Sequence, residues 1–461
     1  MTIHLMVTES APHLKFLTPL VLILLVIPSV CRSQNIYSQD TSQFTPQIEF
    51  FIEQFDNLES PLRFDKNLPL DMLSDFAESY MAQKDYDYAA QILERMLFIE
   101  RGRSGLKSIT ILPILDKLTE IHFLLGHWEA SANYLDHARF ITTSNFGLHS
   151  EEALTIMERQ ANLKMIEFYS GNEKEDPEKV LKARKLLSDT ALIAQDLYQD
   201  KSEEADIWHY KRALSLAELV RIIHSSQNIL ISDFAKGLVR RDGPMRFHGA
   251  SRYSNVIGEG YLRQAHSHIQ MIQDSAQVRG DDEIAALAEL YKGDFNLLSG
   301  RGSGRQQYNN ARTGFLKAGI PRKKIQELFA TPVPIPVPEF FMSLEELLIY
   351  QRGRSQPSKY TGGATVFQIT SDWHSKMQKF FNHDYCSALS QLGLELQHIE
   401  LKVSISKLGK SAISDMGGGH SADPVNLRAL SAMRFRPIYH EGKLHAVRDF
   451  NIRYSFLKHM R

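Results

Sequence analysis

Apolar residues at helical spacing recur in two copies between residues 73 and 138, and this recurrence constrains the fold of the 461-residue chain more than any other feature. Each copy divides at a short break, and Tyr86 and Trp128 occupy equivalent places after it, 42 residues apart. A helical hairpin has an apolar side that it cannot bury alone, so we expect successive hairpins to stack into an array. The pattern is carried by Phe76, Ala77, Tyr80, Ala89, Leu93 and Met96 in the first copy and by Leu115, Leu118, His122, Ser131, Leu135 and Ala138 in the second.

The two copies resemble the tetratricopeptide repeat. In that family a short turn with an aromatic residue joins two helices, and the second helix approaches the first through a small residue, here Ala89 or Ser131. The copies depart from the family where Leu73 and Leu115 replace the expected tryptophan, and the closing proline is absent. The resemblance implies a concave surface that binds a peptide or a protein.

The helical pattern continues with less regular spacing to about residue 330, and we predict a helical repeat domain over residues 45–330 with about five hairpins. Pro177 after Asp176 is typical of a helix start, because proline suits the first helical position and aspartate caps it. The glycine-rich run 300–304 lacks the Gly-Lys-Ser/Thr of a phosphate-binding loop and is interpreted as a hairpin loop. The further helices are expected over 152–169, 177–198, 203–224, 256–273, 281–299 and 305–318.

A proline-rich run, TPVPIPVP, follows the repeats at residues 331–338. Prolines at this density favour an extended and fairly stiff backbone. We therefore predict a linker over residues 331–360 and a domain boundary there.

The periodicity changes to strict alternation in the last part of the chain, residues 361–461. Apolar residues alternate with polar ones over 399–405 and again over 450–456, which indicates strands with one solvent-facing side. A helix is expected to begin at Asp423, between a second strand over 411–416 and a third over 434–439. The fold class is therefore mainly α, a helical hairpin array followed by a small α+β domain.

About sixty carboxy-terminal residues resemble the carboxy-terminal domain of the TonB energy-transducer family. That resemblance implies an α+β fold whose exposed sheet edge accepts an extended peptide, with Asn451 and Arg453 as possible contacts on the last strand. The long proline-rich spacer of the family is missing, so the resemblance favours recognition over energy transduction. The TonB-like motif consists of Arg434, Phe435, Arg436, Pro437, Gly442 and Lys443, preceded by a glycine turn at Gly409.

The amino-terminal residues have the form of a secretory signal. Lys15 precedes an apolar run over 16–30, and small residues follow it up to Ser33. The run is shorter than the roughly 20 residues that span a bilayer. We predict a signal peptide over residues 1–33, cleaved between Ser33 and Gln34; a retained signal anchor and a lipoprotein at Cys31 are the alternatives.

No residue pattern indicates a catalytic, metal or cofactor site. His266 and His268 are two residues apart, so a helix points them to different faces, and Cys386 is expected to be a small buried residue. The formal net charge of −1 argues against a nucleic-acid-binding surface. We predict a non-enzymatic periplasmic protein–protein interaction or scaffold protein with an unidentified protein or peptide partner. The alternative is an inner-membrane-anchored TonB-family component of outer-membrane transport, and membrane association is expected only with an uncleaved signal.

We expect the mature protein to begin at Gln34, because the small side chain of Ser33 suits the residue before a signal-peptidase cut. Amino-terminal sequencing of the exported protein tests this expectation. Recovery from the membrane fraction of a chain that still contains residues 16–30 would contradict it and support the anchored alternative.

Overall fold

The computed structural model describes part of the chain, and all described residues lie beyond the predicted signal segment with its cleavage site at Ser33 and Gln34. Most of residues 225–255, between the helices expected over 203–224 and 256–273, lie outside the described part, as does the start of the helix expected at Asp423. Within it, no helix combines the length and apolar character needed to cross a bilayer. The described residues are 70–170, 176–198, 202–225, 250–300, 302–357, 365–381, 385–417 and 429–460.

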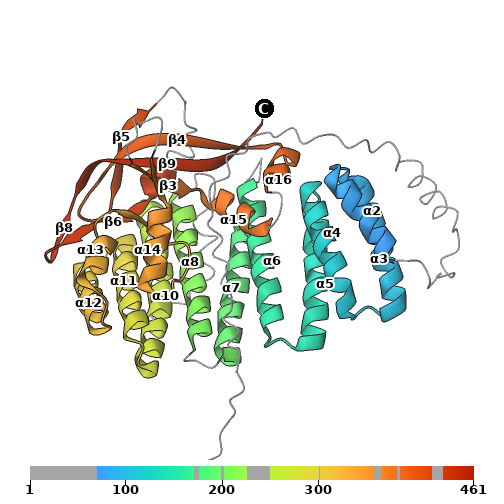
Figure 1. Ribbon diagram of the computed structural model, residues 1–461, viewed down its shortest axis with the longest axis horizontal. Helices are drawn as coiled ribbons and strands as arrows, with labels where there is room; N and C mark the ends of the chain where they lie inside the picture. Colours follow the sequence, from blue (N-terminus) through green and yellow to red (C-terminus); the bar gives the residue numbers. More distant parts are fainter. Residues whose placement is uncertain are drawn as a thin grey trace, which may run out of the picture. The chain divides into compact units, whose positions relative to one another are not determined.

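Ten helices between residues 70 and 317 form five hairpins in the described part of the chain, and each hairpin contacts the next (Figure 1). The predicted helical array followed by a small α+β region is confirmed. The hairpins pair α2 (Leu70–Ala82) with α3 (Tyr86–Ser104), α4 (Leu112–Leu124) with α5 (Trp128–Phe146), α6 (Glu151–Ser170) with α7 (Pro177–Tyr198), α8 (Glu203–Ser225) with α10 (Ala250–Arg279), and α11 (Asp282–Ser299) with α12 (Arg305–Lys317).

The first two hairpins follow the repeated sequence pattern closely. Tyr86 and Trp128 are the first residues of α3 and α5, as their equivalent places in the sequence suggested. Ala89 and Ser131 are completely buried where the second helix approaches the first, and Ser131 Oγ donates a hydrogen bond to the Thr119 carbonyl at 2.8 Å. Small side chains at these positions therefore permit the close helix contact.

The start of α7 shows how local chemistry determines a helix boundary. Pro177 is its first residue, and the Glu178 N–H donates to Asp176 Oδ1 at 2.9 Å. The aspartate thereby satisfies an N–H group that has no partner within the helix. This predicted helix start is confirmed.

Residues 318–357 differ from the extended linker that was expected over 331–360. They include α13 (Arg322–Leu328), β1 (Val333–Ile335), α14 (Leu344–Gly353) and β2 (Ser355–Pro357). Val333 and Val337 are completely buried, and β1 pairs antiparallel with β6 (Arg434–Arg436). The prolines do make the segment extended, but the valines and isoleucine between them bury their side chains, and a proline-containing strand is tolerated in a two-stranded ladder that needs few N–H donors.

The carboxy-terminal region is built on a five-stranded sheet with the order β2-β3-β9-β4-β5. The long strands β4 and β9 are antiparallel neighbours, and β3 runs parallel to β9. Ile399, Leu401 and Val403 are buried along β4, as the alternation predicted. The further elements are β3 (Thr365–Thr370), α15 (Asp372–Phe380), α16 (Tyr385–Gln391), β4 (Leu394–Ile405), β5 (Ser411–Gly417), β7 (Ile438–His440), β8 (Lys443–His445) and β9 (Val447–His459).

The last strand is not at the edge of this sheet, which corrects the proposed edge contacts at Asn451 and Arg453. Strand β9 lies between β3 and β4, so both of its sides are already paired. Asn451 stands opposite Lys402, and Arg453 donates two hydrogen bonds to Glu400 Oε1 at 2.8 and 2.5 Å. In the described part of the chain, the edges of this sheet are β2 and β5.

Replacing Gly293 of α11 by alanine should destabilise the array. An added Cβ would lie 2.5 Å from a ring carbon of Tyr308, which is completely buried on α12 and cannot move aside freely. We expect a loss of about 1–3 kcal/mol in the free energy of unfolding, measured by urea denaturation of the full chain. Gly353→Ala is the matched control, because nothing lies within 4 Å of its added Cβ. Equal midpoints for the two variants would contradict the close contact.

Candidate functional site

The TonB-like motif lies at the junction between the carboxy-terminal region and the repeats. Arg436 on β6 is completely buried, and its Nε and Nη2 donate to Asp294 Oδ1 at 2.9 Å and to Oδ2 at 2.5 Å. Asp294 belongs to α11, and its Oδ1 also accepts the Tyr308 hydroxyl hydrogen bond at 2.9 Å. The ion pair therefore joins β6 of the carboxy-terminal region to the last repeat hairpin.

The neighbours of Arg436 and Tyr308 determine the pKa values of these two buried groups. Burial alone would lower the pKa of the Arg436 guanidinium, but the neighbouring carboxylate of Asp294 raises that pKa above its ordinary value. Burial and Asp294 raise the pKa of Tyr308 well above its usual range. Tyr308 thus remains a protonated donor to Asp294.

The other motif residues also make internal contacts. Phe435 is buried, and its N–H donates at 2.9 Å to the carbonyl of Gly409, which adopts φ +72° in the β4–β5 turn. An added Cβ at Gly409 would lie 2.2 Å from the Phe435 carbonyl, so only glycine permits this contact. Pro437 is buried between β6 and β7.

The remaining motif positions lie at its two ends. The Arg434 guanidinium is partly buried, and it donates to the carbonyls of Ala432 and Met433 at 3.5 and 3.3 Å. Gly442 adopts φ +75° in the turn before β8, and Lys443 begins that strand with an exposed side chain. Among these motif residues, Arg436 makes the contact with the repeats, and Lys443 is exposed.

Helix α15 makes a second junction with the repeats. Asp372 accepts from Arg221 of α8 at 2.9 Å, and Lys376 lies 3.2 Å from Glu218, which also accepts the Tyr169 hydroxyl hydrogen bond at 2.8 Å. Apolar contacts extend this junction to α4, because the ring centres of Phe380 and Phe381 lie 4.7 and 5.0 Å from the ring centre of Phe123.

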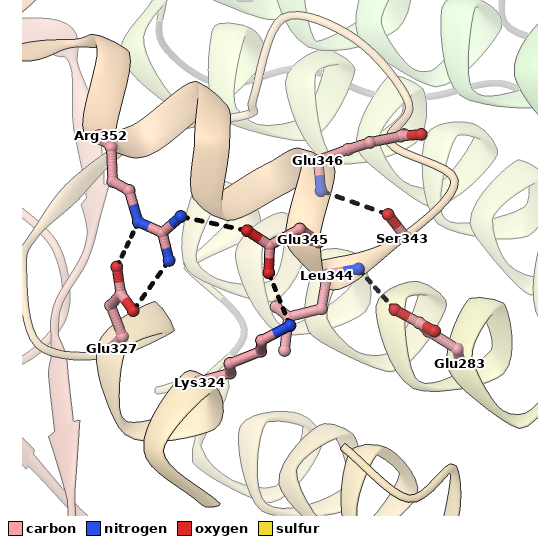
Figure 2. A network of polar contacts seen from close by, with 8 residues as sticks. All are labelled: Glu283, Lys324, Glu327, Ser343, Leu344, Glu345, Glu346 and Arg352. Atoms are coloured by element: carbon pink, nitrogen blue, oxygen red, sulfur yellow. Dashed lines mark hydrogen bonds and ion pairs between the residues drawn. The ribbon is translucent and has the colours of Figure 1, made fainter. Parts of the chain in front are cut away.

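A third junction holds α14 against α13 (Figure 2). Arg352 donates to both carboxylate oxygens of Glu327, at 2.6 and 3.0 Å, and to Glu345 at 3.1 Å. Lys324 binds Glu345 from the other side at 2.8 Å. These groups are largely exposed, so the network orients α14 more than it stabilises the fold.

The first turn of α14 is satisfied by acidic and hydroxyl side chains. The Leu344 N–H donates to Glu283 of α11 at 2.7 Å, and the Glu346 N–H donates to Ser343 Oγ at 3.2 Å (Figure 2). The contact with Glu283 ties this helix start to the repeat array as well.

The Leu344–Glu283 contact lies at the first turn of α11. The first two junctions lie toward the opposite end of the repeat helices. Phe123 is the second-last residue of α4, Tyr169 is the second-last residue of α6, and Arg221 lies in the last turns of α8. Figure 1 shows the sheet beside this end and the opposite loops free of it. Exposed apolar side chains occur at those opposite ends, and they include Leu106, Ile109, Phe146, Leu148 and Val278. These loop ends are the candidate interaction surface.

His137 holds one of these loops in place. Its Nδ1 accepts from Arg101 Nη2 at 2.8 Å, and its Nε2 donates to the Leu106 carbonyl at 3.3 Å. Burial, with a further contribution from Arg101, lowers the pKa of His137 below 6.5. The ring is thus neutral at pH 7 and bridges α3, α5 and the loop between α3 and α4.

The histidine and cysteine positions considered in the sequence do not form a chemical site. His268 Nδ1 lies 3.1 Å from His209 Nδ1 on α8, and burial lowers the pKa of His268 to about 3, so the His268 ring is neutral at pH 7. No group of three potential metal ligands occurs in the described part of the chain. Cys386 is exposed, contrary to its expected burial, and it is not a free thiol.

Comparisons with known proteins give a limited result. No protein-family model and no curated protein matches the sequence. Among solved structures, a Podosopora anserina kinesin light chain with nearly identical TPR-like repeats matches with 12% identity and a TM-score of 0.31, over 54% of this chain and 96% of that chain. BtubC (BKLC) from P. vanneervenii matches with 13% identity and a TM-score of 0.30, over 66% and 98%. Scores this low support no functional conclusion.

Sequence reasoning did not identify Asp294 as a site residue. A signal was present, because this acidic residue follows Leu290 and Tyr291 on the apolar side of α11 and an unpaired carboxylate there would be costly. Its partner Arg436 is 142 residues away, and no local pattern indicates such a pairing.

Replacing Arg436 by methionine should destabilise the protein strongly, because Asp294 would remain buried without its cation. We expect a loss of about 3–5 kcal/mol in the free energy of unfolding, measured in urea. Arg352→Met is the control, since it removes a largely exposed arginine and should cost far less. The double variant Asp294→Leu and Arg436→Met should regain part of the loss. Equal losses for the two single variants would contradict this assignment.

Acid should loosen the loop that His137 holds. The pKa of His137 is lower in the folded protein than in the unfolded chain, so its stabilising contribution is present above about pH 6.5 and is lost as the pH falls. Amide hydrogen exchange of residues 105–109 should therefore accelerate between pH 7.5 and pH 5, beyond the intrinsic change. His137→Gln should abolish the extra acceleration, and His149→Gln on the next loop should retain it. Acceleration that persists in His137→Gln would contradict the role of His137.

Proposed function

We propose that this protein is an exported interaction scaffold of the periplasm, in which the helical repeat array binds a protein partner and the TonB-like carboxy-terminal region is docked on the array. One observation carries the proposal. The carboxy-terminal region covers one end of the repeat helices, whereas the opposite loop ends display exposed apolar side chains such as Leu106 and Leu148. Apolar surface of this kind on a repeat array is typical of protein binding.

The docked carboxy-terminal region supports a scaffold more than a mobile arm. Three separate junctions join it to the array, through Asp294, Glu218 and Glu283. Separating the region would expose the buried Arg436 guanidinium and leave Asp294 without its cation. The sheet could still take part in binding, because β5 has an unpaired edge in the described structure and Ser414 and Asp415 are exposed on it.

The alternative function is a membrane-anchored TonB-family energy transducer for outer-membrane transport. It requires that the apolar run 16–30 remain in the chain as an anchor. It also requires a carboxy-terminal domain that can move away to its receptor, which the buried Arg436–Asp294 pair opposes. Export to the periplasm rests on the signal-like residues 1–33, and the proposed scaffold role does not depend on an anchor.

Crosslinking in intact cells, followed by identification of the attached proteins, tests the proposal. Point variants are preferable to truncation, because removing the sheet would also remove Arg436 and leave Asp294 of the array without its cation. If the array is the docking site, Phe146→Asp should remove crosslinked partners and Ser414→Lys on β5 should not. The reverse result would assign binding to the sheet edge. An absence of specific crosslinked proteins for the wild type would contradict the scaffold function itself.

A further inference from the structure

Five exposed apolar side chains lie in or beside the two loops that join successive hairpins, α3–α4 and α5–α6. Two contacts bring the separate segments together: Asn145 Nδ2 donates to the Lys107 carbonyl at 2.6 Å, and His137 binds the Leu106 carbonyl. The five side chains are between 44% and 62% exposed. We call them the loop-end surface: Leu106, Ile109, Phe140, Phe146 and Leu148.

The five exposed side chains are not needed for the buried core of the array. Neighbouring residues of α5, such as Ile141 and Thr142, already supply the buried contacts of that helix. Burial of these side chains by another molecule would be favourable, because it would remove apolar surface from water. Clusters of this kind on a protein surface mark places where another molecule binds.

The charges beside the loop-end surface are positive. Arg101, Lys107 and Arg139 border it, and in the described structure none of the three forms an ion pair with a carboxylate. Lys107 Nζ instead lies 5.4 Å from the centre of the Phe140 ring, and Arg101 binds the neutral ring of His137. Glu100 is buried, so it does not offset these cations at the surface.

The positive charge is a local property. The whole chain has a formal net charge of −1. Exposed acids also lie near the surface: Asp136 lies one turn before Phe140 on α5, Asp196 lies 3.7 Å from His149, and Glu151 and Glu152 begin α6 beyond Leu148. A basic rim around apolar side chains suits a partner that brings carboxylates and apolar groups together. Carboxylates of such a partner would lie at the rim of the buried apolar contact and would pair with these arginine and lysine side chains, which lie beside aromatic rings.

From these observations we infer that the loop-end surface binds an acidic segment of a partner protein whose carboxylates pair with Arg101, Lys107 and Arg139. Aromatic or aliphatic side chains of that segment cover Phe140, Phe146 and Leu106. This inference rests on the proposed scaffold function and specifies the chemistry of the partner.

Binding of a short fluorescein-labelled peptide, in which glutamates alternate with phenylalanines and leucines, tests the inference by fluorescence anisotropy with the full-length protein. Lys107→Glu and Phe140→Ala should each weaken binding at least about tenfold. Arg263→Glu and Met271→Ala, which change an exposed cation and an exposed apolar residue of α10 away from the loop ends, are the matched controls and should leave binding unchanged. Circular dichroism should show that all four variants remain folded.

Changes in the peptide separate the two parts of the contact. Replacing its glutamates by glutamine should weaken binding and abolish its salt dependence, and replacing its apolar residues by alanine should weaken binding at every salt concentration. Equal affinity for the glutamine peptide would overturn the electrostatic assignment. No measurable binding of the acidic peptide would overturn the inference, whereas partners found by crosslinking in cells would still support the scaffold function.

Two further measurements exclude other occupants. Residues 46–59 of the same chain also combine acids with apolar residues, so tighter peptide binding by a full-length Glu49→Gln and Glu53→Gln variant would reassign the surface to this segment. Sedimentation with phosphatidylglycerol vesicles that Lys107→Glu and Phe140→Ala abolish would reassign it to an anionic membrane. Unchanged peptide affinity in the first measurement and no sedimentation in the second would support the partner-protein assignment.

Discussion

The buried ion pair between Arg436 and Asp294 is the interaction on which the rest of the arrangement depends. A guanidinium without a counter-charge in this place would be severely destabilising, so β6 can be buried only where α11 supplies the carboxylate. Once β6 is held there, β1 pairs with it, and the side chains of Val333, Ile335 and Val337 become part of the core. Strand β6 and the last repeat hairpin thus form one structural unit.

This junction gives the two ends of the repeat helices different roles. At one end, α15 and the sheet cover the array, and the contact of Phe380 with Phe123 extends the covering to the second hairpin. At the other end, loops such as the one at Leu106 remain uncovered. Because one end of the array is covered by the same chain and the other end is open, the proposed scaffold can keep its shape while it binds a partner.

The local elements were predictable because their causes are local. Asp176 and Pro177 determine a helix start by capping and by a fixed backbone angle, and Ala89 and Ser131 indicate close helix contacts through their small size. The position of Arg453 was not predictable in the same way. Alternation indicates which face of a strand is buried, but it contains no information about which strands become its neighbours. The supposed edge strand is therefore an interior one.

The sequence by itself determined the hairpin array, most helix boundaries and the alternation of the carboxy-terminal strands, since spacing, capping and side-chain size act over a few residues. Only the tertiary structure decided that Val333, Ile335 and Val337 join the core, that Arg436 pairs with Asp294, and that the loop-end surface brings Leu106 and Phe146 together. These contacts join residues that are distant in the chain, and burial makes their pairing favourable only after the surrounding elements have packed.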